Sequence, residues 1–210
     1  GIGFRNPTGS IYGRVVYGNG QAVEGAAVRL EASDNTQLGK SVLLNGNAGS
    51  YLKVDSLVSA FIDSAFTIEA WIKPTDASPK NQIIFSRRGQ YELGFNSNGE
   101  IYFTYNGKSV SGDYVNPNQS YIHVAGINSH DSLLIMLNDS VIAVSSIQYT
   151  ATNPTQVDRA VYIGAGAAGG YFKGNIDEMR AWNIAVPVAQ IARDYTRLLA
   201  GNENGLIAYW

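Results

Sequence analysis

The chain contains no cysteine among its 210 residues, which excludes disulfide bonds and thiolate zinc sites and leaves the redox compartment open. Charged residues are scarce as well, at 15% of the sequence against roughly 25% in ordinary soluble domains. The formal net charge is −2, and the nearest approach to a basic cluster is the pair Arg87 and Arg88. Because binding to phosphates needs a basic surface, we expect no nucleic acid partner.

Long apolar runs are missing too. The longest obvious one, from Leu133 to Leu137, falls far short of the roughly 18 residues that a membrane helix needs. We therefore expect no membrane span. No secretion signal precedes Gly1, and we expect any such signal to have been removed or to lie upstream of this chain.

Glycine (23 residues) and tyrosine (13 residues) are abundant. This mixture favours short strands joined by tight turns, because glycine and asparagine tolerate the positive φ that turns require. Apolar residues at every second position, with turn residues between the runs, predict an all-β sandwich or barrel. The expected strands are residues 66–74, 83–85, 91–95, 101–105, 121–127, 133–137, 141–144, 161–164, 175–182 and 205–210.

One segment has the period of a helix instead. We predict a helix from Pro187 to Leu199, because proline suits the first turn and Gly201 suits the end. Its apolar stripe consists of Val188, Ile191, Tyr195 and Leu198.

The first 36 residues differ from the rest. Residues 11–17 and 27–31 are predicted strands, and two strands alone are marginally stable in water, so residues 1–36 are expected to form part of a small β domain or an arm on the main one. Residues 13–30 resemble the opening strands of the carboxypeptidase-regulatory-like (prealbumin-type) family. In that case, the strands that complete this domain are expected beyond Trp210 in the parent protein.

The remaining residues, 37–210, resemble the laminin-G-like, or concanavalin-A-like lectin/glucanase, jelly-roll family in its bacterial form. The resemblance implies an antiparallel two-sheet jelly-roll sandwich with one short C-terminal helix, and it implies a structural role for His123. The matching segments, in order, are residues 41–46, 66–74, 121–125, 161–164, 171–182, the predicted helix and residues 205–210.

Catalysis is not expected. Resemblance to glycan-hydrolysing members of this superfamily implies paired carboxylates two residues apart on one strand, which would act as acid and nucleophile. This chain has no such alternation, and the adjacent Asp177 and Glu178 would face opposite ways in a regular strand. The glycine-rich residues 164–170 are interpreted as a flexible loop between strands, because they lack the ending of a phosphate-binding loop.

The same resemblance implies a structural Ca²⁺ site. Its ligands would be Asp177 and oxygen atoms of the loop Asn45, Gly46 and Asn47, since Ca²⁺ takes six to eight hard oxygen ligands. Related sequences often carry aspartate where this chain has Asn45, which lowers the expected affinity. The alternative is that Asp177 only accepts hydrogen bonds from turn amides.

Candidate ligand-binding residues are those out of phase with the core stripes. Aromatic rings with nearby amides and carboxylates match the apolar face and the hydroxyl groups of a sugar. Alternation alone does not decide which face of a sheet is exposed, so Trp71 has core packing as its alternative. The candidates are Tyr102, Thr104, Trp71, Glu92 and Tyr114, with Arg87 and Arg88 as added donors.

Together these features predict a non-catalytic, extracytoplasmic recognition module within a larger surface or secreted protein. Carbohydrate binding or adhesion is the main hypothesis, with a glycan or a surface protein as the partner. The alternatives are a structural or protein-interaction domain that packs on neighbouring domains of a larger chain, and a diverged glycoside hydrolase.

Overall fold

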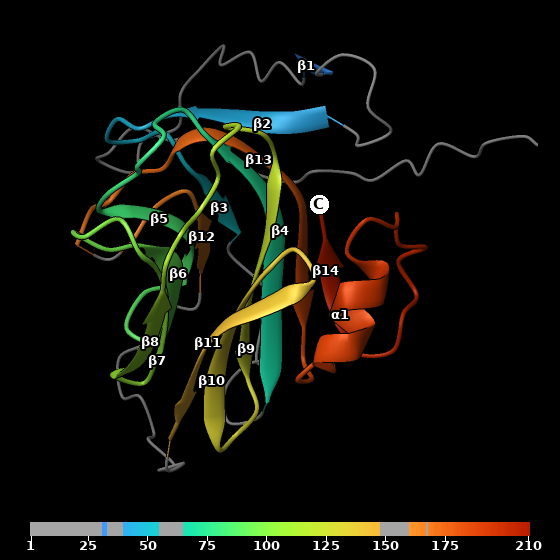
Figure 1. The fold of residues 1–210 in the computed structure, drawn as a ribbon. Helices are drawn as coiled ribbons and strands as arrows, with labels where there is room; N and C mark the ends of the chain where they lie inside the picture. The colour runs from blue at the N-terminus through green and yellow to red at the C-terminus, as the bar shows by residue number, and fades with distance from the viewer. Residues whose placement is uncertain (1–30, 33–39, 55–64, 148–159, 167) are drawn as a thin grey trace, which may run out of the picture.

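The computed structural model describes residues 31–32, 40–54, 65–147, 160–166 and 168–210. These residues form two antiparallel β-sheets, packed face to face, and one short helix (Figure 1). The predicted all-β jelly-roll sandwich with a C-terminal helix is therefore confirmed. No helix in the described ranges is long and apolar enough to cross a membrane.

The larger sheet has eight strands in the order β1-β2-β13-β4-β9-β10-β11, and β14 also pairs with β13. The longest of them, β4 and β13, lie side by side at its centre. The bounds are β1 Glu31–Ala32, β2 Lys40–Asn45, β4 Phe66–Pro74, β9 Ile122–Asn128, β10 Ser132–Leu137, β11 Ser140–Ser146, β13 Lys173–Trp182 and β14 Leu206–Tyr209.

The smaller sheet has six strands in the order β3-β12-β5-β6-β7-β8. Two of these, β3 and β8, were not predicted from the sequence. The strand β3 has three residues, none of them fully buried, and β8 has only Val110 buried. The bounds are β3 Leu52–Val54, β5 Gln82–Arg87, β6 Tyr91–Phe95, β7 Ile101–Tyr105, β8 Lys108–Gly112 and β12 Val161–Ile163.

The main hydrophobic core lies between the two sheets. The inward stripe of β4 occupies every second position of the strand predicted at residues 66–74, and it consists of Phe66, Ile68, Ala70 and Ile72. Phe66 meets Phe103 of β7 edge-on, with ring centroids 5.9 Å apart. Gly126 of β9 lies under the same Phe103 ring, and a Cβ there would come within 2.8 Å of it. This glycine lets the two sheets approach each other.

A second apolar cluster covers the outer face of the eight-stranded sheet. The helix α1, Val188–Asp194, lies on this face, on the opposite side from the second sheet (Figure 1). Ile191 of α1 packs with Ile127, Met136 and Trp182 of the sheet. The central strand β4 is therefore buried on both faces, from Phe66 to Ile72.

The helix is shorter than predicted: it ends at Asp194, and Leu198 is 56% exposed. Side chains of the sheet bind the carbonyl groups that follow. Trp71 Nε1 donates to the carbonyl of Tyr195 at 3.1 Å, and Arg180 Nη2 donates to that of Arg197 at 2.7 Å. These carbonyls are thus satisfied by the sheet, and the chain leaves the helical path.

The predicted strands at 11–17 and within 27–30 lie outside the described residues. Residues 31–32 form β1, which pairs with β2 of the larger sheet. The division between residues 36 and 37 also falls outside the described ranges and stays a prediction.

Candidate functional site

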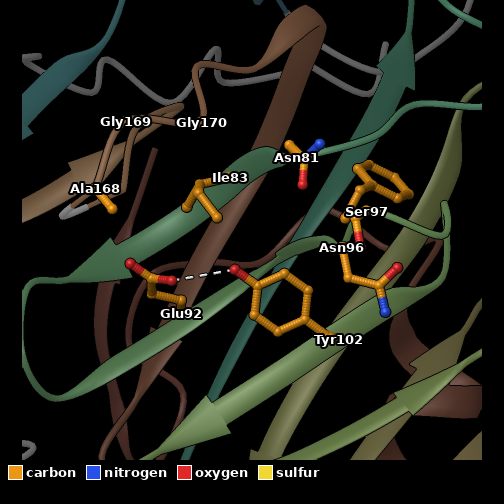
Figure 2. Close-up of a pocket in the computed structure, with 10 residues that line it drawn as sticks. Asn81, Ile83, Glu92, Asn96, Ser97, Tyr102, Ala168, Gly169 and Gly170 are labelled. Carbon is orange, nitrogen blue, oxygen red and sulfur yellow. Dashed lines mark hydrogen bonds between the residues drawn. The ribbon is translucent and has the colours of Figure 1, made fainter.

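A pocket of about 370 Å³ opens on the outer face of the six-stranded sheet (Figure 2). Its floor consists of Ile83 of β5, Glu92 of β6 and Tyr102 of β7. Residues after β12 form one wall, and residues around the hairpin between β6 and β7 form the other. The wall residues are Ala168, Gly169 and Gly170 on one side and Asn81, Phe95, Asn96 and Ser97 on the other.

Strand register places Tyr102 beside Glu92. Tyr102 pairs with Gly94 and Glu92 pairs with Thr104, so the two are diagonal neighbours on one face. Gly94 presents no side chain, and the Tyr102 ring therefore has room to extend across β6. Its hydroxyl donates to Glu92 Oε2 at 3.1 Å, as Figure 2 shows.

The Tyr102 hydroxyl is held in its protonated form. Burial raises the pKa of Tyr102 above its ordinary value of 10.0, and the adjacent Glu92 carboxylate raises the pKa further. An ionised phenol beside a carboxylate is disfavoured by repulsion. The hydroxyl thus stays a hydrogen-bond donor throughout the neutral pH range.

The glycine-rich segment packs against the sheet instead of standing away from it. Ile83 N donates to the carbonyl of Gly170 at 2.8 Å, and Gly166 N donates to that of Gly169 at 3.1 Å. A Cβ at position 166 would come within 2.6 Å of Ile83 Cγ1 and 3.1 Å of Glu92 Oε1. Close backbone packing therefore needs glycine at positions 164, 166 and 170, and the flexibility of the loop stays a prediction.

The opposite wall is a well-bonded hairpin turn. Asn96 Oδ1 accepts hydrogen bonds from the backbone of Asn98 at 2.9 Å and of Glu100 at 3.1 Å. Asn96 Nδ2 donates to Glu100 Oε2 at 2.7 Å. Gly99 completes the turn with φ +86°. The turn joins the strands predicted at residues 91–95 and 101–105, and its bonds fix the shape of the wall.

The predicted ligand residues divide into those at the pocket and those elsewhere. Tyr102 and Glu92 form the floor, and Thr104 lies opposite Glu92 on the same face, half-buried. Tyr114 instead packs edge-on against Phe95 at 4.8 Å and belongs to the margin of the core.

The two arginines are not donors at this pocket. Arg87 is buried, with 2% of its surface exposed. The Arg88 guanidinium lies over the ring of Tyr162, 4.0 Å from its centroid. Tyr162 packs with Tyr51, whose ring also stacks near Tyr171. Arg88 thus caps an aromatic cluster at the β3–β12 edge of the sheet.

Trp71 lies on the other sheet, so its alternative reading is the correct one. It is 9% exposed and stacks on Tyr195 after α1, with ring centroids 5.7 Å apart and an interplanar angle of 23°. It is part of the packing beneath the helix and is not a platform for a ligand.

A buried polar network lies next to Trp71. Glu69 Oε1 accepts a hydrogen bond from Trp182 Nε1 at 2.7 Å, and Glu69 Oε2 lies 3.0 Å from His123 Nε2. Arg180 Nη1 is 3.9 Å from the same carboxylate. Burial alone would raise the pKa of Glu69, but His123, Arg180 and Trp182 outweigh it, so the pKa lies below its ordinary value. His123 is fully buried, in keeping with the structural role implied for it.

The residues predicted to hold Ca²⁺ do not fit one ion. Asn45 pairs with Lys173, whereas Asp177 pairs with Trp71, four residues further along β13. At about 3.3 Å per residue this is roughly 13 Å, too far for ligands of one ion. The described residues also contain no group of three or more histidine, cysteine, aspartate or glutamate side chains that could hold a metal ion. Ca²⁺ binding itself stays a prediction, checked by the unfolding midpoint in Ca²⁺ and in EDTA.

Both halves of that predicted site have local partners. Asn45 Oδ1 accepts from the backbone of Asn47 at 2.9 Å. Asp177 Oδ1 accepts from the backbone of Glu178 at 2.9 Å, within a β-bulge where Glu178 has φ +50°. The bulge breaks the alternation expected at this position, and Glu178 lies beside Arg180, with Oε2 and Nη2 3.5 Å apart.

Sequence reasoning missed the walls of the pocket. Asn81, with φ 52°, and residues 168–170 are far from Tyr102 in the sequence, and only the packing of β5 between β12 and β6 brings them together. The dense glycines were the available signal, since glycine often marks a close backbone approach.

Comparison with known proteins agrees with the fold. The family model described as the concanavalin A-like lectin/glucanases superfamily matches residues 44–192. None of the curated proteins compared with the chain matches it in sequence.

Solved structures share the fold at low sequence identity. One is a putative carbohydrate binding protein from Bacteroides ovatus (TM-score 0.63, 20% identity, 76% of this chain and 48% of that one). Another is domain 4 of AbnA, a GH43 extracellular arabinanase from Geobacillus stearothermophilus, in complex with arabinotriose (TM-score 0.60, 18% identity, 86% and 84%). A third is the binding domain of botulinum neurotoxin DC in complex with SialylT (TM-score 0.57, 10% identity, 83% and 46%). The chain thus spans about half the length of the first and third. With a family model that covers most of its length, the chain belongs to the concanavalin A-like lectin/glucanase superfamily.

Proposed function

We propose that this chain is a carbohydrate-binding module whose ligand occupies the pocket on the outer face of the six-stranded sheet. One observation carries the proposal: an aromatic ring, a carboxylate and amide groups converge around Tyr102 and Glu92 in one concave site. A sugar presents apolar C–H groups to a ring and hydroxyl groups to polar partners, and binding pockets combine these two kinds of surface.

Structural neighbours add support of a general kind. The Bacteroides ovatus protein is described as carbohydrate binding, and the AbnA domain was solved with arabinotriose. Each of these neighbours is less than 25% identical to this chain, so their ligands do not identify its own. They favour a glycan over other ligand classes for the proposed site.

The proposed role is binding without hydrolysis. Canonical glycoside hydrolysis uses two carboxyl groups, about 5–9.5 Å apart. Within the described part of the pocket lining, Glu92 is the single carboxylate, and Glu69 is buried beneath α1 on the other sheet. We further propose an extracytoplasmic location within a larger surface or secreted protein, in keeping with the extracellular arabinanase that carries the AbnA domain.

A glycan array followed by calorimetry tests the proposal. We expect the protein to bind at least one glycan, and Tyr102→Ala to weaken that binding by about fivefold or more, since stacking on an aromatic ring contributes on the order of 1 kcal/mol or more. Ser109→Ala, an exposed change on neighbouring β8, serves as the control and is expected to bind normally. Silence across the array, or binding that is unaffected by Tyr102→Ala, would contradict the proposal.

A further inference from the structure

The Tyr102 ring lies beside a strand position that has no side chain. Strand register aligns Ile83 of β5, Gly94 of β6 and Tyr102 of β7 in one row across the sheet. A Cβ at position 94 would come within 3.1 Å of Ile83 Cδ1, so it would stand on the same outer face as the pocket. Glycine leaves the backbone of β6 bare at this point, and the ring can lie across it.

A hydrogen bond determines where the far end of the ring lies. The Tyr102 hydroxyl donates to Glu92 Oε2 at 3.1 Å. Because Glu92 is two residues before Gly94 on β6, this bond draws the ring over the neighbouring strand. Figure 2 shows the ring face-on, with its hydroxyl group directed toward Glu92. One face of the half-buried ring therefore rests on the sheet, and the other face lines the pocket.

The acceptor of this hydrogen bond also has a defined position. Glu92 is half-buried, and a Cβ at position 166 would come within 3.1 Å of Glu92 Oε1. The backbone of Gly166 is held in turn, because its N–H donates to the carbonyl of Gly169 at 3.1 Å. The carboxylate thus stands between the Tyr102 ring and the glycine-rich segment, where it can direct the hydroxyl.

A tyrosine on the outer face of a strand has several staggered χ1 rotamers, and each of them points the ring in a different direction. The rotamer that reaches Glu92 is the one that places the ring over Gly94. A side chain that is ordered only when the ligand arrives weakens binding, by roughly threefold or more for a single side chain. A ring that is already fixed avoids this loss.

From these observations we infer that Glu92 is a positioning residue, which holds the Tyr102 ring over Gly94 so that the pocket presents a preformed stacking surface to a sugar. This inference rests on the proposed carbohydrate-binding function and adds how the site is organised before the ligand arrives. The role belongs to Glu92 as a hydrogen-bond acceptor. An amide oxygen at the same place would therefore serve as well.

A measurement on the ligand-free protein tests the positioning directly. In protein labelled at tyrosine, NMR couplings across χ1 of Tyr102 report whether the side chain occupies one rotamer or several. We expect one rotamer in the wild-type protein and in Glu92→Gln, and an average over several rotamers in Glu92→Ala. A single rotamer that persists in Glu92→Ala would overturn the inference.

A double-mutant cycle then relates the ring position to binding of the best glycan from the array. Tyr102→Phe keeps the ring, removes only the hydroxyl and leaves every other contact of Glu92 in place. We expect Tyr102→Phe and Glu92→Ala each to weaken binding by roughly threefold, and the double variant to bind no more weakly than either one, because all three lack the same hydrogen bond. Glu92→Gln is expected to bind nearly as well as the wild-type protein.

Asp131→Ala, which removes an exposed carboxylate outside the pocket lining, is the matched control and is expected to change neither readout. If the two single effects multiply in the double variant, or if Tyr102→Phe binds with wild-type affinity, Glu92 does not act through Tyr102 and the inference is wrong. Silence of the wild-type protein across the array overturns the proposed function and the stacking role with it. The rotamer measurement still decides in that case whether Glu92 fixes the ring.

Discussion

At the residue scale, the charges in the buried network are expected to depend on one another. Glu69 is 3% exposed and faces His123, Trp182 and Arg180. Removing one partner from a buried ionic group leaves an uncompensated charge, which is strongly unfavourable. The network therefore contributes to stability as a unit.

We predict that Glu69→Ala lowers the free energy of unfolding by about 3–5 kcal/mol at pH 7. Because the pKa of Glu69 is lowered in the folded state, its ionised form stabilises the protein above the unfolded pKa, and this contribution is lost as pH falls through the folded pKa. Urea unfolding at pH 7 and at pH 3 measures both effects. Asp131→Ala, at an exposed position, is the control. If Glu69→Ala lowers the free energy of unfolding as much at pH 3 as at pH 7, the ionised form of Glu69 is not what stabilises the protein.

The pKa of Asp177 is shifted in the opposite direction to that of Glu69, so its contribution to stability has the opposite pH dependence. Burial raises its pKa to about 6, against the opposing hydrogen bond from the Glu178 amide. Folding therefore favours the protonated form of Asp177. The stability that this form contributes is fully present below about pH 4 and is lost as pH rises through 6.

We accordingly predict that Asp177→Asn stabilises the protein by roughly 1–3 kcal/mol at pH 8 and by little at pH 4. Asparagine keeps the Oδ1 acceptor and carries no charge. Thermal unfolding at the two pH values is the measurement, with exposed Asp131→Asn as the control. If the substitution destabilises the protein at pH 8, the negative charge of Asp177 has a partner, such as a bound cation.

At the element scale, the strand pattern was the most predictable feature. The inward stripe of β4 and the separation of Tyr102 from the core stripe of β7 follow from simple alternation, whereas the exposure of the Tyr102 face does not. Burial of the outer face of β4 does not follow from local pattern, because it depends on α1, which lies over 110 residues later in the chain. The length of α1 was overestimated because its end also depends on distant residues. Trp71 and Arg180 of the sheet donate hydrogen bonds to the carbonyl groups that follow it.

The helix offers a direct test of this second core. We predict that Ile191→Ala, at a position 2% exposed, destabilises the protein by about 2–5 kcal/mol through lost burial and the cavity left behind. Leu198→Ala removes a leucine from the predicted stripe that is 56% exposed, and it is expected to change stability by no more than about 0.5 kcal/mol. Equal effects in urea unfolding would mean that the helix extends to Leu198 and buries it.

At the scale of the whole molecule, the two sheets have separate tasks. The central strands of the eight-stranded sheet are covered on both faces, by the second sheet and by α1. The six-stranded sheet leaves part of its outer face to solvent, and the pocket forms there. Family resemblance predicted this sandwich, but the pocket walls come from loops whose meeting depends on the order β12-β5-β6, which periodicity does not reveal.

The relation of residues 1–36 to this sandwich is the remaining question at this scale, and limited proteolysis with mass spectrometry addresses it. The resemblance of residues 13–30 to a prealbumin-type domain predicts early cleavage before the sandwich, with residues 37–210 surviving as a protected product. The pairing of β1 with β2 predicts instead that the protected product keeps residues 31–32. If residues 1–36 resist the protease as long as β4 and β9 do, they belong to the sandwich, and the boundary at residue 36 is wrong. A product that starts after residue 32 and keeps the full unfolding midpoint would show that β1 contributes little to the larger sheet.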